Sequence, residues 1–120
     1  MAKILLKQGR VIDPANNLDA VRDVLIDGGK IAKIGTRIKV LGAREINAKG
    51  MLIIPGLIDM HVHLRDPGRP DKETISSGTR AAAAGGFTSI CCMPNTEPPI
   101  DNQAVVKYVR DKAISYGVVN

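Results

Sequence analysis

The only two histidines of the chain, His61 and His63, stand two residues apart at the end of an apolar run over residues 51–58. In an extended strand, residues i and i+2 point to the same face, with a rise of about 3.3 Å per residue. Two imidazoles placed in this way can bind one metal ion, since Zn–N bonds are about 2.0–2.1 Å long. The same spacing also occurs in strands that bind no metal, so the pair alone leaves both interpretations open.

Other polar residues surround the two histidines. Asp59 has their strand parity and could orient a metal ligand, or it could serve only as a hydrogen-bonding residue at the base of the strand. Arg65 carries a planar guanidinium that suits a carboxylate. Asp66 is expected to shape the turn at Pro67-Gly68, which ends the strand. Polar residues at the C-terminal end of a buried strand are typical of barrel active sites.

The first 53 residues predict short strands with tight turns and no helix. The expected strands cover residues 2–7, a short segment before Pro14, 21–26, 30–34 and 44–48. No group of residues in this region suggests chemistry.

From residue 52 the pattern changes to alternating strands and helices, which indicates a parallel α/β sheet with right-handed crossovers. The histidine strand is expected to be followed by a helix over 71–84, which Gly85-Gly86 closes. A buried strand over 87–93 and a loop over 94–99 come next. A second helix, capped by Asp101 or Asn102 and ended by Gly117, then leads to the start of a third strand at Val118-Val119. Two strands and two helices cannot close an eightfold barrel, which takes about 250 residues. We therefore expect the chain to be an N-terminal piece of a longer protein.

Composition excludes some classes of function. The net charge is +5, from 17 basic and 12 acidic residues that are scattered, and the chain has one Phe, two Tyr and no Trp. Nucleic-acid binders show a basic stripe and often stacking aromatics, so nucleic acid is not an expected partner. No apolar run approaches the roughly 18 residues of a membrane span. Adjacent Cys91 and Cys92 cannot readily form a disulfide and are expected to pack in the core, which favours a reducing, cytoplasmic setting.

Two segments carry a resemblance to a known family. Residues 55–68, Pro-Gly-Leu-Ile-Asp-Met-His-Val-His-Leu-Arg-Asp-Pro-Gly, resemble the signature of the amidohydrolase superfamily and, more closely, of the bacterial class I dihydroorotases. Residues 93–99, Met-Pro-Asn-Thr-Glu-Pro-Pro, resemble a second dihydroorotase motif. The resemblance implies that residues 54–120 start a (β/α)8 TIM-like barrel and that residues 1–53 are part of a small β-sandwich.

The resemblance also implies roles for individual residues. His61 and His63 would bind the catalytic zinc, and Arg65 and Asn95 would hold the substrate carboxylate. Glu97 would lie near the mouth of the site. The remaining metal ligands and the acid–base residue would come from later strands, so none is expected within this chain, and the chain alone should be inactive and hold zinc weakly.

The implied reaction interconverts N-carbamoyl-L-aspartate and L-dihydroorotate in de novo pyrimidine biosynthesis. Two alternatives stay open. One is a non-catalytic dihydroorotase-like subunit that supports aspartate transcarbamoylase. The other is an allantoinase or dihydropyrimidinase, although these relatives typically lack an arginine where Arg65 stands. Association with aspartate transcarbamoylase or with further copies of the chain is likewise left open.

Overall fold

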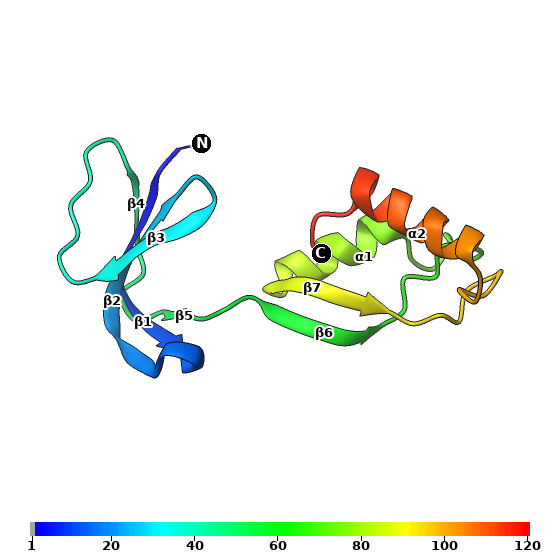
Figure 1. Ribbon diagram of the computed structural model, residues 1–120, viewed down its shortest axis with the longest axis horizontal. Coiled ribbons are helices and arrows are strands. Elements are labelled where there is room, and N and C mark those ends of the chain that lie inside the picture. The colour runs from blue at the N-terminus through cyan, green and yellow to red at the C-terminus, as the bar shows by residue number, and fades with distance from the viewer. Residues whose placement is uncertain (1) are drawn as a thin grey trace. The chain divides into compact units, whose positions relative to one another are not determined.

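The computed structural model describes residues 2–120. The chain divides into two compact units, Met1–Pro55 and Gly56–Asn120 (Figure 1).

The first unit is a single mixed sheet. Its strands are β1 (Ile4–Asp13), β2 (Leu18–Asp27), β3 (Lys30–Gly35), β4 (Arg44–Asn47) and β5 (Leu52–Ile53), and a 3-10 turn (Pro14–Asn16) joins β1 to β2. The sheet order is β3-β2-β1-β4, with β5 also paired to β1. The β1–β2 and β2–β3 pairs are antiparallel, whereas β4 and β5 run parallel to β1. Residues 2–55 contain one sheet, so the expected sandwich would need a second sheet from elsewhere.

Asp23 stabilises a β-bulge in β1, where β1 pairs with β2. The β1–β2 register shifts between Leu6 and Gly9, and Gln8 takes a positive φ of 62° there. The Asp23 carboxylate is only 3% exposed and accepts hydrogen bonds from the backbone N–H groups of Gln8, at 2.9 Å, and Ile38, at 2.8 Å. Because this bulge is stabilised, β1 continues as one ten-residue strand, whereas the sequence predicted two short ones.

Residues 52–53 also differ from the prediction. The apolar run over 51–58 was expected to lead directly into the histidine strand, but Leu52 and Ile53 pair with β1 of the first unit. Pro55 and Gly56 follow outside any strand, because proline cannot donate to a ladder.

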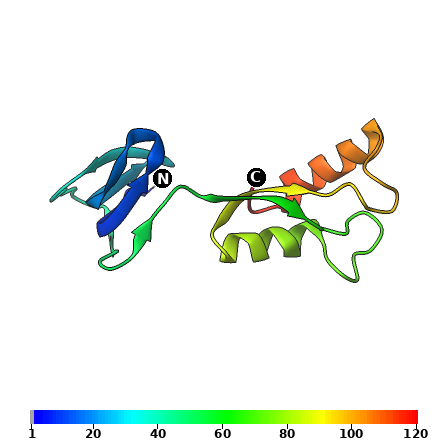
Figure 2. The same ribbon diagram turned by 90° about the horizontal axis from the view of Figure 1, so that it is seen from below.

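The second unit begins with the histidine strand. It contains β6 (Leu57–Val62), α1 (Ile75–Ala84), β7 (Phe87–Cys92) and α2 (Gln103–Tyr116), and β6 and β7 are parallel (Figure 2). The N–H of Met93 donates to the Val62 carbonyl, while the N–H of Ile90 donates to the Asn120 carbonyl. In addition, the N–H of Asn120 donates to the Thr88 carbonyl. Since alternate residues bond to opposite edges of a strand, Asn120 lies along the edge of β7 that faces away from β6. Val118 and Val119, where the sequence predicted the start of a third strand, belong to no strand in the structure.

The helix ends follow from their caps. The helix α1 was predicted from residue 71 but begins at Ile75, because Thr74 is its N-cap and exchanges hydrogen bonds with Ser77 in a capping box. It ends at Ala84, before the predicted Gly85-Gly86. The helix α2 is capped by Asn102, one of the two expected candidates, whose side chain accepts from the N–H groups of the second and third following residues.

Both helices cover the same face of β7. A cavity of about 80 Å³ is lined by residues from β7 and the two helices, among them Ile75, Thr79, Ile90, Cys92, Val109 and Ala113. Burial there raises the pKa of the Cys92 thiol. Cys91 is exposed, so the expected core role is wrong for that cysteine.

The histidine strand is less buried than predicted. Ile58 and Met60 on β6 are 64% and 77% exposed, because strand side chains point to the faces of a sheet and, among the described residues, neither helix packs extensively on β6. Within residues 2–120, neither α1 nor α2 has the length and apolar content that a membrane-crossing helix requires.

Candidate metal and substrate site

The two histidines lie close enough to share one ion. His61 is on β6 and His63 follows the strand end, and their ring centroids are 5.2 Å apart with 61° between the ring planes. Zn–N bonds of about 2.0–2.1 Å in tetrahedral geometry would place two imidazole centroids about 5 Å apart. The observed separation of the rings therefore fits binding of a single metal ion.

A hydrogen bond sets the tautomer of His63. Its Nδ1 lies 2.9 Å from Oδ1 of Asn95, which is on the loop after β7. An amide oxygen can only accept, so Nδ1 of His63 carries the proton and donates it. Nε2 then keeps its lone pair, and this is the arrangement that metal-binding histidines usually show.

Asp59 stabilises the strand rather than an imidazole. Its Oδ1 accepts a hydrogen bond from the backbone N–H of His61 at 3.0 Å. No three His, Cys, Asp or Glu side chains gather to hold a metal within residues 2–120. His61 and His63 thus fall short of the three protein ligands usual for catalytic zinc.

Arg65 and Asn95 line one small cavity. Its volume is about 200 Å³, and Arg69, Lys72 and Glu97 also contribute to its wall. Three cationic side chains against one carboxylate favour an anionic ligand. Arg65 takes a φ of 57°, a left-handed conformation that is uncommon for a residue with a side chain.

The two loops that carry Arg65 and Asn95 are packed tightly together. The N–H of Glu97 donates to the Pro67 carbonyl at 3.2 Å. Gly68 has a φ of 106°, and a Cβ on it would lie 2.5 Å from both the Cβ and the carbonyl oxygen of Glu97. Only glycine fits there, so the Pro67-Gly68 turn both ends the strand and permits the contact between loops.

An ion pair orders the rim of the cavity. The guanidinium of Arg69 donates two hydrogen bonds of 3.0 Å to the carboxylate of Asp71. Asp71 raises the pKa of Arg69, and Arg69 lowers the pKa of Asp71. The charge of Arg69 is thus partly neutralised by Asp71. Of the three cationic side chains that line the cavity, Arg65 and Lys72 do not share in this ion pair.

Asp66 has a role that the sequence analysis missed. It was expected only to shape a turn, yet it is 5% exposed and accepts hydrogen bonds from Tyr108 Oη at 2.9 Å and Lys112 Nζ at 3.2 Å. Both donors lie on α2, four residues apart, and such residues share one face of a helix. That spacing is the only signal in the sequence, and it does not identify Asp66 as the acceptor.

Comparisons with known proteins agree with this arrangement. Residues 50–120 match the dihydro-orotase-like family. The chain is 55% identical over 118 residues to the dihydroorotase of Aquifex aeolicus, with 98% of this chain and 28% of that protein covered. It is 56% identical over 115 residues to the dihydroorotase of Syntrophotalea carbinolica, with 96% and 27% covered.

Solved structures give a related result. A D-hydantoinase superposes with a TM-score of 0.82 at 33% identity, with 98% of this chain and 26% of that chain covered. The dihydropyrimidinase from Brevibacillus agri gives a TM-score of 0.80 at 31% identity, with the same coverage. The chain spans little more than a quarter of the length of the curated relatives it matches. Because the family match takes in the histidine strand, both loops and both helices, the chain belongs to the dihydro-orotase-like family.

Proposed function

We propose that this chain supplies the first metal ligands and the carboxylate-binding residues of a dihydroorotase, which interconverts N-carbamoyl-L-aspartate and L-dihydroorotate. The observation that carries the proposal is the hydrogen bond between His63 and Asn95, which joins a metal-compatible imidazole pair to a cationic cavity. The relatives named dihydroorotase are about 55% identical to the chain, compared with about 33% for the hydantoinase structure.

The cavity suits the substrate carboxylate. Both L-dihydroorotate and N-carbamoyl-L-aspartate carry a carboxylate next to the reacting ring or chain. The Arg65 guanidinium can donate two parallel hydrogen bonds to such a group, and the Asn95 side-chain N–H₂ can add another. Hydantoin and dihydrouracil have no carboxylate, so a cationic cavity at this place favours dihydroorotate over these neutral rings.

His61 and His63 are the residues that would hold the metal, which we propose is zinc. When bound, zinc polarises the amide carbonyl and lowers the pKa of a bound water to about 7. His63 is held by Asn95 with Nε2 available, and Asp59 fixes the backbone at His61. The chain's own part in the reaction is therefore to bind, orient and neutralise, while the acid–base residue lies outside the described residues.

The proposed setting is a (β/α)8 barrel with residues 1–53 as part of a small β-sandwich. Three features support this setting: β6 and β7 are parallel, the backbone of Asn120 bonds to the other edge of β7, and residues of both helices line one cavity with residues of β7. The free cysteines Cys91 and Cys92 are compatible with a reducing, cytoplasmic setting for this enzyme. A non-catalytic partner of aspartate transcarbamoylase is less favoured, because both histidines are present at a metal-compatible separation.

A substrate panel tests the proposal. The complete protein that contains this sequence is purified with zinc and assayed with L-dihydroorotate, hydantoin, allantoin and dihydrouracil. We expect kcat/KM for L-dihydroorotate to exceed the others, and Arg65→Lys to raise KM for L-dihydroorotate because Lys cannot reproduce the bidentate fork. Turnover of a neutral ring with none of L-dihydroorotate would contradict the assignment.

A further inference from the structure

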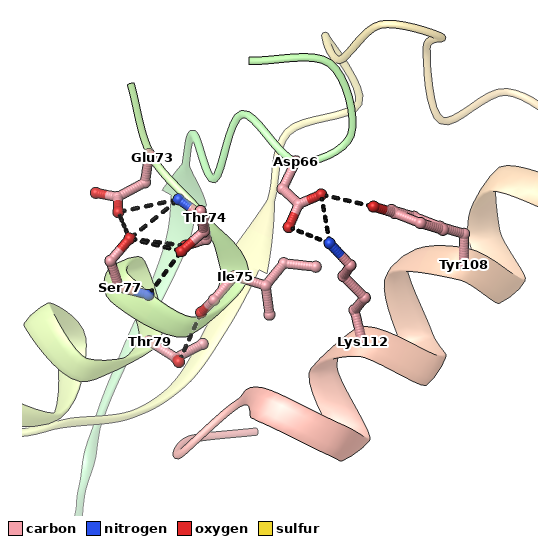
Figure 3. A network of polar contacts seen from close by, with 8 residues as sticks. All are labelled: Asp66, Glu73, Thr74, Ile75, Ser77, Thr79, Tyr108 and Lys112. Atoms are coloured by element: carbon pink, nitrogen blue, oxygen red, sulfur yellow. Dashed lines mark hydrogen bonds and ion pairs between the residues drawn. The ribbon is translucent and has the colours of Figure 1, made fainter. Parts of the chain in front are cut away.

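Asp66 joins the loop of the proposed substrate arginine to the helix α2. Its carboxylate lies 2.9 Å from Tyr108 Oη, and its two oxygens lie 3.4 and 3.2 Å from Lys112 Nζ (Figure 3). At 5% exposure, this carboxylate needs such partners, since a buried charge without them is strongly unfavourable. Asp66 directly follows Arg65, so the contact fixes the backbone next to the arginine.

Tyr108 and Lys112 act as one unit. Lys112 Nζ lies 5.0 Å from the centroid of the Tyr108 ring, within the range of a cation–π contact. Tyr108 and Asp66 both raise the pKa of Lys112, so its ammonium keeps its charge throughout the neutral range. The pair therefore presents one hydroxyl donor and one permanent cation to Asp66.

Contacts lie on both sides of the positive φ of Arg65. A residue with a side chain keeps a positive φ only where the surrounding contacts enforce it. Here the carbonyl of Arg65 accepts from the N–H of Arg69 at 2.8 Å on one side, and Asp66 is held by α2 on the other. The contact of Gly68 with Glu97 then transmits this position to the loop that carries Asn95.

We propose that Tyr108 and Lys112 are positioning residues that, through Asp66, set Arg65 for the substrate carboxylate. Neither lines the cavity of Arg65 and Asn95, so we expect neither to contact the substrate. Their effect is on recognition of the carboxylate rather than on the metal or the reacting amide. The inference rests on the proposed dihydroorotase function.

Steady-state kinetics of the complete zinc-loaded protein test the inference. Tyr108→Phe and Lys112→Met are compared with Lys112→Arg, which keeps the cation, and with Lys107→Met, which removes an exposed lysine of the same helix that pairs with Asp111. We expect Tyr108→Phe and Lys112→Met to raise KM for L-dihydroorotate about tenfold with kcat changed less than about threefold, because small displacements of a positioned group are costly. Lys112→Arg should restore most of the loss, and Lys107→Met should resemble the parent.

Two further readouts separate positioning from a general loss of structure. Zinc content should be unchanged in Tyr108→Phe and Lys112→Met, and inhibition by carboxylate-bearing ring analogues should weaken in parallel with KM. A fall in kcat or zinc content with KM unchanged would overturn the inference, as would parent-like kinetics in both variants. A parent protein without L-dihydroorotate turnover would overturn the proposed function, and this inference with it.

Discussion

Nδ1 of His63 lies 2.9 Å from Oδ1 of Asn95. This hydrogen bond directly joins a residue proposed to bind the metal, His63, to a residue proposed to bind the substrate, Asn95. The same amide can accept from the imidazole and, through its N–H₂ group, donate toward the cavity beside Arg65. Metal binding and substrate binding are therefore expected to depend on one another through Asn95.

Substitutions at Asn95 can separate its two roles. Asn95→Ala removes the acceptor for His63 and is expected to weaken zinc binding about 10–100-fold, the usual effect of losing such a partner. Asn95→Asp keeps an acceptor but places a negative charge beside the substrate, so zinc affinity should hold while KM rises. Competition of the complete protein with a zinc chelator, together with KM, checks both. Equal zinc affinity in parent and Asn95→Ala would show that the hydrogen bond does not support the metal ligand.

Gly68 is expected to be intolerant of a side chain. Gly68→Ala puts a methyl group 2.5 Å from Glu97 at a φ of 106°, so the two loops must separate. We expect a loss of about 1–3 kcal/mol in the free energy of unfolding of the second unit. The two tyrosines of the 120-residue chain, Tyr108 and Tyr116, both lie on α2, so near-ultraviolet circular dichroism in urea reports on this unit.

The matched control for Gly68 is Gly86→Ala. Gly86 also has a positive φ, of 83°, but a Cβ on it would meet no atom within 4 Å. Its substitution should cost only the backbone strain, about 1–2 kcal/mol. It should also leave KM for L-dihydroorotate unchanged in the complete protein, whereas Gly68→Ala should raise it. Parallel effects of the two substitutions on KM would contradict the account of loop packing.

Asp23 should make the first unit sensitive to acid. Burial raises the pKa of Asp23, but hydrogen bonds from the N–H groups of Gln8 and Ile38 and the charge of Lys7 lower it more, so the net pKa is below the usual value. A carboxylate with a lowered pKa stabilises the fold above its unfolded-state pKa of about 3.9, and this contribution is lost as pH falls through the folded-state value. We therefore expect the unit to lose stability below about pH 4.

Asp23→Ala should abolish much of this acid sensitivity and lower stability at neutral pH by about 2–4 kcal/mol, because two buried N–H groups lose their acceptor. Amide hydrogen exchange of β1 and β2 measured at several pH values would show both effects. Asp19→Ala, which removes an exposed partner of Arg10, is the control and should change exchange little. Equal exchange in the parent and Asp23→Ala at pH 7 would contradict the role given to Asp23.

The 120-residue chain on its own should bind zinc weakly and show no dihydroorotase turnover. It offers His61 and His63 but no third His, Cys, Asp or Glu ligand within residues 2–120. Isothermal titration with zinc and a coupled assay with L-dihydroorotate check this. Turnover by the isolated chain would mean that the remaining share of the relatives' length is not needed for chemistry.

Local sequence signals predicted the second unit well where caps decide the structure. Asn102 and Gly117 bound α2 as expected, and β7 was placed within one residue. The start of α1 was missed because Thr74 and Ser77 form a capping box that outweighs the helical composition of residues 71–74. The continuous β1 was missed because the acceptor that stabilises its bulge, Asp23, lies 15 residues from Gln8.

The candidate site shows the same division. The spacing of His61 and His63 predicted a metal-binding pair. The two loop motifs predicted that Arg65 and Asn95 belong to the same site. Asp66 is separated in sequence by 42 residues from Tyr108 and by 46 residues from Lys112, so no local pattern could reveal these contacts. Nor could the sequence show that β6 is largely exposed, because the exposure of its side chains depends on which elements pack on its two faces.

Metal-dependent turnover tests the central claim most directly. The complete protein is stripped of metal with a chelator, reloaded with zinc and assayed with L-dihydroorotate, alongside His61→Ala and His63→Ala. The account predicts that the parent loses activity on stripping and regains it with zinc, while each variant binds less zinc and loses at least about a thousandfold in kcat/KM. Full activity of the stripped parent, or of either histidine variant, would contradict it.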